Sequence, residues 1–407
     1  MSERIVMRGW RIRHYYRTDG GTMDKPRIIF PFAEAGLGHI MPLKSIADAF
    51  EKKYGDITQC VRTSFFGDSD DRHLRAFGKF IGEEVVKQNR HTFYGFLSTF
   101  VMTLFGTRIS SWATMKVRVR GAYAAAVARM EQLRPDLVVS THWATNYYAE
   151  RLSPKPLTAV YVPDAHINAL FRYPADLTAI SMSTGYETAL KKYRRRFDRD
   201  NLRLVPFAIR EEAFAVDPDK KVNRRKLGLD ENKFTVVLAE GGYGLGKMKE
   251  ICKSVIALDL PVILIPLCGK NDELYRELNA AVCGDRTEMY PQSFRPDVFE
   301  FMASADLFCG KSGNIIAEPT FFGVPSVITK HATGIEKRIG DYYVRKVGCA
   351  VDEFDPRKVA RMIADFAADP GKLDGYRNNA RANRGNYGAE HFADCLFELL
   401  RTRFPHL

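Results

Sequence analysis

The sequence predicts an α/β protein built from two doubly wound domains. The chain has 407 residues, which is long for one domain and suits two. A short apolar strand followed by a glycine-rich turn occurs at residues 27–39 and again at 234–247. Strand, glycine turn and helix in this order begin a doubly wound unit, and the turn opens at the carboxyl edge of the sheet.

The composition restricts the class of protein. Hydrophobic residues make up 45% of the chain and charged residues 27%, as in soluble globular proteins. No apolar run reaches the roughly 18 residues that a spanning helix needs. The net charge of +12 favours an anionic partner, namely a membrane surface, a nucleotide or a nucleic acid. Seven cysteines without a C-x-x-C pair indicate a reducing cytosol and argue against a disulfide framework or a zinc site.

Residues 1–24 are expected to be a basic tail, and they lack the apolar segment of a signal peptide. Two interpretations fit this tail: contact with a lipid interface, or an upstream extension with Met23 as the working start. The first domain is expected over residues 25–206 and the second over 219–380. A C-terminal helix within 381–407 is expected to follow and to cross back to the first domain.

The first domain begins with the strand Arg27–Phe32 and a turn that contains Gly36, Gly38 and His39. The two glycines let the backbone approach a ligand closely. The third glycine of a dinucleotide fingerprint is missing. From the residues alone, His39 is a helix-start residue with local hydrogen bonds.

Residues 85–130 combine clustered aromatic side chains with lysine and arginine, and no acid lies between Glu84 and Glu131. The aromatic residues include Phe93, Phe96, Phe100 and Trp112. One interpretation is an interfacial segment whose rings enter the lipid headgroup layer while its cations meet anionic lipid. The other is a core helix pair with a basic solvent face.

Two later strands of this domain end in polar residues, His142 and Asp164. The carboxyl ends of parallel strands line the cleft of such folds, so both are candidate cleft residues.

The second domain opens with the strand Phe234–Ala239 and a turn with Gly241, Gly242 and Gly244, a candidate phosphate cradle. Position 248 is Met, so the hydroxyl with which a P-loop holds magnesium is missing. This argues against a nucleoside triphosphatase.

The segment Lys311–Pro325 lies between two short apolar strands and predicts a βαβ crossover. Ser312 and Gly313 stand where its helix begins, so free N–H groups could bind a diphosphate there. Glu318, one turn further on, could reach sugar hydroxyls. The alternative is that Ser312 and Asn314 only cap the helix and that Glu318 is a solvated surface carboxylate.

Several short motifs follow one another along the second domain in a fixed order and spacing, and together they resemble the pattern of a known family. They are Phe301–Asp306, Lys311–Gly313, Glu318, Gly323–Pro325 and Thr333–Lys337. This order resembles the donor half of the family 28 glycosyltransferases, in particular the monogalactosyldiacylglycerol synthases and the diacylglycerol glucosyltransferases. The resemblance covers the C-terminal half well and the N-terminal half more loosely. It implies the GT-B architecture, in which two doubly wound domains face each other across a cleft.

The resemblance also implies roles for individual residues. His39 would stand beside the reaction centre as the first candidate for the base, with Asp164 the second. Phe294 would pack against uracil, although core packing is the alternative. Gly334 and Glu336 would hold the transferred hexose.

The chain departs from the family pattern at two positions. Ile335 replaces a glutamine and cannot form hydrogen bonds, so the transferred sugar is left open. Pro319 replaces an alanine and is expected to kink its helix.

The implied activity is inverting transfer of a hexose from UDP-glucose or UDP-galactose to a lipid hydroxyl, most simply that of diacylglycerol. No cofactor, metal or nucleic acid is expected, and the protein would lie peripherally on the cytoplasmic membrane. Three alternatives remain: transfer to a polyprenyl-diphosphate or another amphiphile, a UDP-sugar epimerase, and a non-catalytic nucleotide-sugar-binding protein at the membrane.

Overall fold

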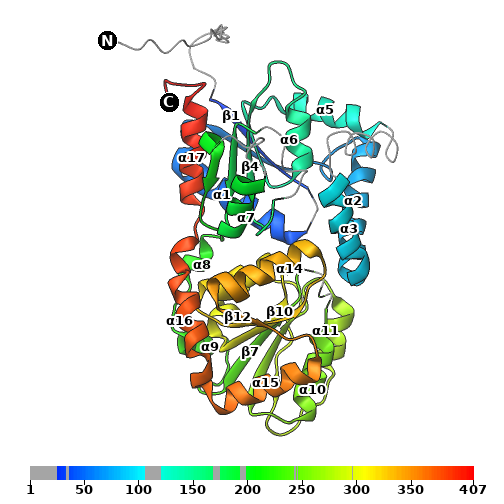
Figure 1. Cartoon of the computed structure of the whole chain (residues 1–407), viewed down its shortest axis with the longest axis vertical. Helices are drawn as coiled ribbons and strands as arrows, with labels where there is room; N and C mark the ends of the chain where they lie inside the picture. Colours follow the sequence, from blue (N-terminus) through cyan, green and yellow to red (C-terminus); the bar gives the residue numbers. More distant parts are fainter. Residues whose placement is uncertain are drawn as a thin grey trace.

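The computed structural model shows two α/β domains stacked along the long axis of the molecule (Figure 1). The structure describes residues 25–33, 36–105, 121–167, 175–192, 199–242, 244, 246–295 and 297–407. The predicted basic tail and Trp112 lie outside these residues.

In the described part of the chain, the first domain contains a parallel sheet of six strands in the order β2-β1-β3-β4-β5-β6. Its strands are β1 (Arg27–Phe32), β2 (Gln59–Ser64), β3 (Leu137–Ser140), β4 (Leu157–Val162), β5 (Leu177–Ile180) and β6 (Leu202–Leu204). Its helices are α1 (Leu37–Tyr54), α2 (Arg72–Arg90), α3 (Thr92–Phe105), α5 (Ala122–Leu133), α6 (Trp143–Ala149) and α7 (Ser183–Lys192).

The second domain repeats this plan, with a described parallel sheet in the order β12-β11-β10-β7-β8-β9. Its strands are β7 (Phe234–Ala239), β8 (Val262–Leu267), β9 (Glu288–Met289), β10 (Leu307–Lys311), β11 (Ser326–Lys330) and β12 (Ala350–Asp352). The helices that follow the first sheet are α8 (Glu212–Ala215), α9 (Lys220–Lys226), α10 (Met248–Ala257), α11 (Asp272–Asn279), α12 (Phe299–Ser304), α13 (Ala317–Phe321), α14 (Gly334–Asp341), α15 (Pro356–Ala368), α16 (Asp374–Ala382) and α17 (Glu390–Arg401).

Both sheets form because their central strands are apolar on both faces. Every residue of β4, β7 and β8 is buried. Parallel strands covered by helices on both sides have this continuous apolar composition. The two sheets therefore direct their carboxyl ends, where polar residues follow the strands, toward the space between the domains.

The chain crosses between the domains at two places that lie side by side. Phe207 and Tyr387 form a parallel bridge, in which the Phe207 N–H donates to Asn386 O at 2.8 Å and the Gly388 N–H donates to Phe207 O at 3.0 Å. Helix α17 then packs on the first domain (Figure 1), where the rings of Phe397 and Tyr54 stack at 4.0 Å.

A buried ion pair anchors α9 to the second sheet. The Asp306 carboxylate accepts from Arg224 Nη2 at 2.6 Å and from the Thr235 N–H at 2.9 Å. Burial raises the pKa of Asp306, but Arg224 and Lys220 outweigh it and the net shift is downward. Asp306, noted in the sequence as part of a motif, is thus a structural residue.

Candidate active site between the two domains

The first domain contributes His39 and Asp164 to the cleft. His39 lies in the first turn of α1, Asp164 follows β4, and His39 Nε2 is 3.8 Å from Asp164 Oδ2. Asp164 is buried, and burial raises its pKa while the neighbouring His39 lowers it. His39 Nδ1 is buried and has no hydrogen-bond partner among the described residues. The pair therefore combines a histidine nitrogen that has no partner in the described structure with a carboxylate beside the ring.

Asn314 of the second domain reaches this pair across the cleft. Its Nδ2 donates to Gly38 O at 3.1 Å and to Asp164 Oδ1 at 3.3 Å, and its buried Oδ1 has no partner in the described structure. A Cβ on Gly38 would lie 3.3 Å from Asn314 Nδ2, so the glycine permits this approach. The expectation that Asn314 only caps a helix is wrong.

His142, the other predicted cleft residue, has a structural role. It precedes α6, and its Nδ1 accepts from the Ala144 N–H at 3.3 Å. Burial, assisted by His39, lowers the pKa of His142 to about 3. The imidazole is therefore neutral near pH 7, as a helix-capping acceptor must be.

The segment after β10 differs from the predicted helix. A short 3₁₀ turn (Asn314–Ile316) leads into α13, which has five residues. Ser312 does not cap this helix, because its Oγ contacts Lys330 O at 3.2 Å and His331 Nδ1 at 2.6 Å. Pro319 lies in the first turn of α13, where no intrahelical N–H is needed, so it removes no hydrogen bond of this helix.

Glu318 is half-buried, and it is not a solvated surface carboxylate. Its Oε2 is inaccessible and has no hydrogen-bond partner in the described structure. Burial raises its pKa to about 7, against a smaller opposing effect of Arg210. A buried carboxyl oxygen normally has a hydrogen-bond donor as its partner, and the described residues supply none. A bound ligand with a hydroxyl group would satisfy it.

Two lysines stand side by side at the carboxyl ends of β10 and β11. Lys311 and Lys330 are register partners in the sheet. Lys311 Nζ donates to Glu336 Oε1 at 2.7 Å and also to Asn89 Oδ1, while Lys330 Nζ donates to Asn89 O at 2.7 Å. Burial lowers the pKa of Lys330, and Glu240 opposes that effect. Two clustered cations at this edge of the sheet form a site suited to a phosphate group.

Lys330 and Asn89 are not among the residues predicted from the sequence. Lys330 could have been found, because it closes the strand after the one that Lys311 closes. The partnership with Asn89 had no signal in the sequence, because Asn89 belongs to α2 of the other domain.

The glycine turn after β7 is only partly open to a ligand. Glu240 Oε1 accepts from the Lys247 N–H at 2.6 Å and Oε2 from the Met248 N–H at 3.1 Å, so a carboxylate already caps α10. Gly241 lies beside the Lys311 side chain and Gly242 beside Leu37 of the first domain, at the cleft. Gly244 instead packs near Cys268 and Leu274, away from the residues above.

The remaining predicted donor residues lie in the first turn of α14 and in the turn after β9. Glu336 Oε2 accepts from the Ala332 N–H at 2.9 Å, and the Gly334 N–H donates to Thr99 Oγ1 of α3 at 3.3 Å. Phe294 is 52% exposed, so the core-packing alternative is wrong. Lys270 Nζ lies 5.5 Å from the centre of its ring.

Helix α3 exposes the predicted aromatic residues only in part. Phe93 is 83% exposed and Phe100 60% exposed, whereas Phe96 is half-buried. Leu97, Val101 and Leu104 are also exposed, which continues the apolar stripe along the same face of the helix. A core position for this face is therefore excluded.

The described residues include no cluster of three or more His, Cys, Asp or Glu with the geometry of a metal site. None of the described helices is long and apolar enough to cross a bilayer.

Solved structures share this architecture along nearly the whole chain. MurG from Acinetobacter baumannii superposes with a TM-score of 0.55 at 12% identity, covering 92% of this chain and 99% of that one. WaaG, a glycosyltransferase involved in lipopolysaccharide biosynthesis, gives 0.52 at 13% identity, with 92% and 99% coverage. The UDP complex of Staphylococcus aureus MnaA gives 0.57 at 14% identity, with 95% and 98% coverage. The chain has the GT-B fold, as predicted.

Sequence relatives show which glycosyltransferases this chain is similar to. The chain is 23% identical over 387 residues to a probable monogalactosyldiacylglycerol synthase 2 of Oryza sativa, covering 88% of this chain and 77% of the relative. It is 28% identical over 188 residues to the processive diacylglycerol beta-glucosyltransferase of Bacillus subtilis, covering 44% and 47%. No protein-family profile matches the chain. Its homologues are thus the diacylglycerol glycosyltransferases of family 28, and the predicted resemblance is confirmed.

Proposed function

We propose that this chain is an inverting hexosyltransferase that moves a hexose from a UDP-sugar to a diacylglycerol-type lipid. The observation that carries the proposal is the meeting of His39 and Asp164 with Asn314 of the opposite domain, beside the Lys311–Lys330 pair. The names of the homologues support the lipid acceptor, and the UDP-bound structural neighbours support the donor.

In the proposed reaction, the acceptor oxygen attacks the anomeric carbon as the bond from that carbon to the diphosphate breaks. His39 accepts the acceptor proton, and the diphosphate oxygen keeps the bonding electron pair. His39 is preferred over Asp164 because its Nδ1 is buried without a partner, whereas Asp164 already accepts from Asn314.

The charge that develops on the leaving diphosphate would be stabilised by Lys311 and Lys330. Preorganised cations at the site of developing charge are an effective form of catalysis in a water-poor cleft. The backbone at Ser312 and Gly313 would assist, although the five-residue α13 contributes only a small helix dipole. No metal is required in this scheme, so we expect EDTA to leave turnover unchanged.

The rest of the donor would be held by residues of the second domain. Glu318 would accept from the ribose hydroxyls, which supplies the donor that its buried Oε2 lacks. Gly334 and Glu336 would contact the hexose, and Phe294, exposed at the turn, would stack on uracil.

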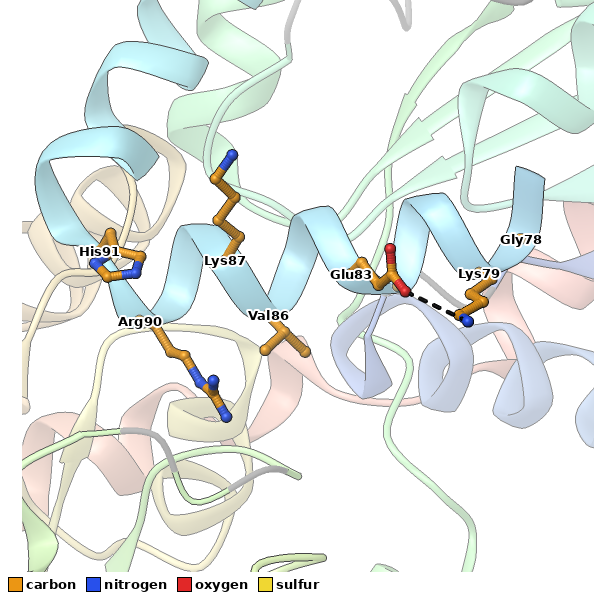
Figure 2. Close-up of a pocket in the computed structure, with 8 residues that line it drawn as sticks. Gly78, Lys79, Glu83, Val86, Lys87, Arg90 and His91 are labelled. Atoms are coloured by element: carbon orange, nitrogen blue, oxygen red, sulfur yellow. Dashed lines mark ion pairs between the residues drawn. The ribbon is translucent and has the colours of Figure 1, made fainter. Parts of the chain in front are cut away.

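The lipid would be reached from a membrane surface that α2 and α3 contact. The apolar stripe of α3 would enter the headgroup layer. On α2, a groove of about 490 Å³ is lined by Lys79, Lys87, Arg90 and His91, with Glu83 paired to Lys79 (Figure 2). Lys87 and Arg90 project from different sides of this helix, so its cationic surface is broad. These cations favour anionic lipid on the cytoplasmic face.

Radiolabelled UDP-glucose and UDP-galactose, offered separately with mixed lipids, test the proposal. We expect one of the two to yield labelled glycolipid with diacylglycerol as acceptor. Label on a polyprenyl-diphosphate would identify the other acceptor class. UDP-sugar binding without any transfer would show a non-catalytic protein and refute the proposal.

A further inference from the structure

Helix α3 has two faces with different surroundings. Its outer face carries the exposed apolar stripe of Phe93, Phe100 and their neighbours. Its inner face presents Gly95 to Ala332 in the loop before α14 and Thr99 to Gly334, the first residue of α14; both Gly95 and Thr99 are buried. The same helix therefore contacts solvent with one side and a candidate donor-binding loop with the other.

The inner face fits that loop closely. A Cβ on Gly95 would lie 2.1 Å from Ala332 O, and a Cβ on Gly334 would lie 3.0 Å from Thr99 Cγ2. Thr99 Oγ1 accepts from the Gly334 N–H at 3.3 Å. Helix α3 and the segment Ala332–Gly334 are in close contact. If α3 moves, this segment must therefore move with it, or the hydrogen bond between Thr99 and Gly334 must break.

A second contact lies at the end of the preceding helix. Asn89, in the last turn of α2, accepts from Lys311 through its side chain and from Lys330 through its carbonyl. Lys311 also binds Glu336, which lies in the first turn of α14, two residues after the Gly334 that α3 contacts. Two contacts thus join α2 and α3 to the candidate donor site: α3 contacts Ala332 and Gly334, and Asn89 of α2 contacts Lys311 and Lys330. We call these two contacts together the seam.

We infer that binding of a lipid bilayer to α3 and binding of the UDP-sugar are coupled through the seam. This inference rests on the proposed function and adds a regulation of the same site. In the present arrangement, Asn89 and Glu336 occupy the lysines that a diphosphate would need. A bilayer that draws α3 outward loosens the seam, releases both lysines from Asn89 and strengthens binding of the anionic donor.

The coupling must be reciprocal, because both ligands act on one equilibrium. If vesicles tighten UDP binding by a given factor, UDP must tighten vesicle binding by the same factor. Couplings of this kind commonly amount to about 5- to 150-fold in affinity.

The test measures UDP affinity by calorimetry on the full chain, with and without vesicles of phosphatidylcholine and phosphatidylglycerol that contain no diacylglycerol. We expect vesicles to tighten UDP binding at least about fivefold. In Thr99→Val the factor should fall below about twofold, because the acceptor for the Gly334 N–H is lost. Gly95→Ala, which forces α3 from Ala332, is a second variant and should also reduce the factor.

Thr103→Val is the matched control. Thr103 lies on the same helix, and its Oγ1 donates within the helix to Thr99 O at 2.7 Å. Its coupling should equal that of the parent protein. Vesicle pelleting, a readout independent of UDP, should persist in all three variants because the outer stripe is unchanged.

The outcomes separate the inference from the proposed function. If UDP or the vesicles fail to bind the parent protein, the proposed function fails and the inference fails with it. If both bind but the UDP affinity is unchanged by vesicles, the inference alone is wrong. Equal coupling in the parent protein, Thr99→Val and Gly95→Ala would also overturn it, because the seam would then transmit nothing.

Discussion

The buried carboxyl group of Glu318 makes donor binding depend on pH. Burial raises its pKa from 4.5 to about 7, so near neutral pH a large fraction of the ligand-free protein carries a protonated Glu318. The carboxylate can accept a hydrogen bond at each of its two oxygens, whereas the protonated carboxyl group uses one oxygen as a donor. Donor binding should therefore release a proton and should strengthen as pH rises through 7.

The size of the effect follows from this pKa. If the bound carboxylate stays ionised, the affinity for UDP-glucose should rise about tenfold between pH 6 and pH 8. Glu318→Gln removes the ionisation and the charge-assisted hydrogen bond. Its affinity at pH 8 should be weaker by about 1.5–3 kcal/mol, and its pH dependence should lack the Glu318 step.

The same ionisation affects stability in the opposite sense. Between pH 4.5 and 7 the folded protein binds more protons at Glu318 than the unfolded chain, so this group lowers stability as pH rises through that range. The full cost above pH 7 is at most about 3 kcal/mol, reduced by solvent screening at this half-buried residue. Glu318→Gln should therefore be more stable than the parent protein at pH 8.

Calorimetric titration with UDP-glucose at pH 6, 7 and 8, without lipid acceptor, measures the binding effect. UDP-glucose is suitable because its diphosphate diester does not ionise in this range. Urea unfolding at the same pH values measures the stability effect. Identical pH slopes for the parent protein and Glu318→Gln would refute the reasoning.

Three further predictions concern the base, the membrane and the fold. His39→Ala should reduce kcat by about 100-fold or more while the UDP Kd changes little; if turnover survives and Asp164→Asn abolishes it, the roles are exchanged. Phe93→Asp combined with Phe100→Asp should abolish vesicle pelleting and transfer to vesicle lipid but preserve UDP binding, and transfer at the parent rate would contradict the membrane role of α3. Asp306→Ala should lower the free energy of unfolding by about 3–5 kcal/mol in urea, because it leaves a buried arginine unpaired. Since the pKa of Asp306 is lowered, its stabilising contribution should be present above pH 3.8 and be lost as pH falls further; a variant as stable as the parent protein at pH 7 would contradict this assignment.

The parts of the fold that local signals encode were predictable. The strand Arg27–Phe32 coincides with β1, because an apolar run that ends at a glycine turn needs no distant partner to be recognised. Helix boundaries were less accurate, because the helix expected to begin at Ser312 and Gly313 begins only at Ala317, after a 3₁₀ turn.

Many individual residues of the candidate site could be predicted from the sequence, but the contacts between them could not. Asn314 reaches Gly38 and Asp164, and Lys330 reaches Asn89, all across the domain boundary. Hydrophobic periodicity reports burial and says nothing of such partners. The capping expectation for Ser312 failed for the same reason, because its partner His331 comes from the next strand end.

The two adjacent chain crossings at Phe207 and Tyr387 determine how the domains can move. A single flexible connection would allow the domains to swing in any direction. Two connections that are hydrogen-bonded to each other restrict the relative motion of the domains mainly to one hinge rotation, about an axis that passes near both connections. Because α17 is fastened to the first domain, opening about this axis should widen the cleft most at the rim far from the hinge. A bulky substrate would then enter from that rim while the hinge side stays closed.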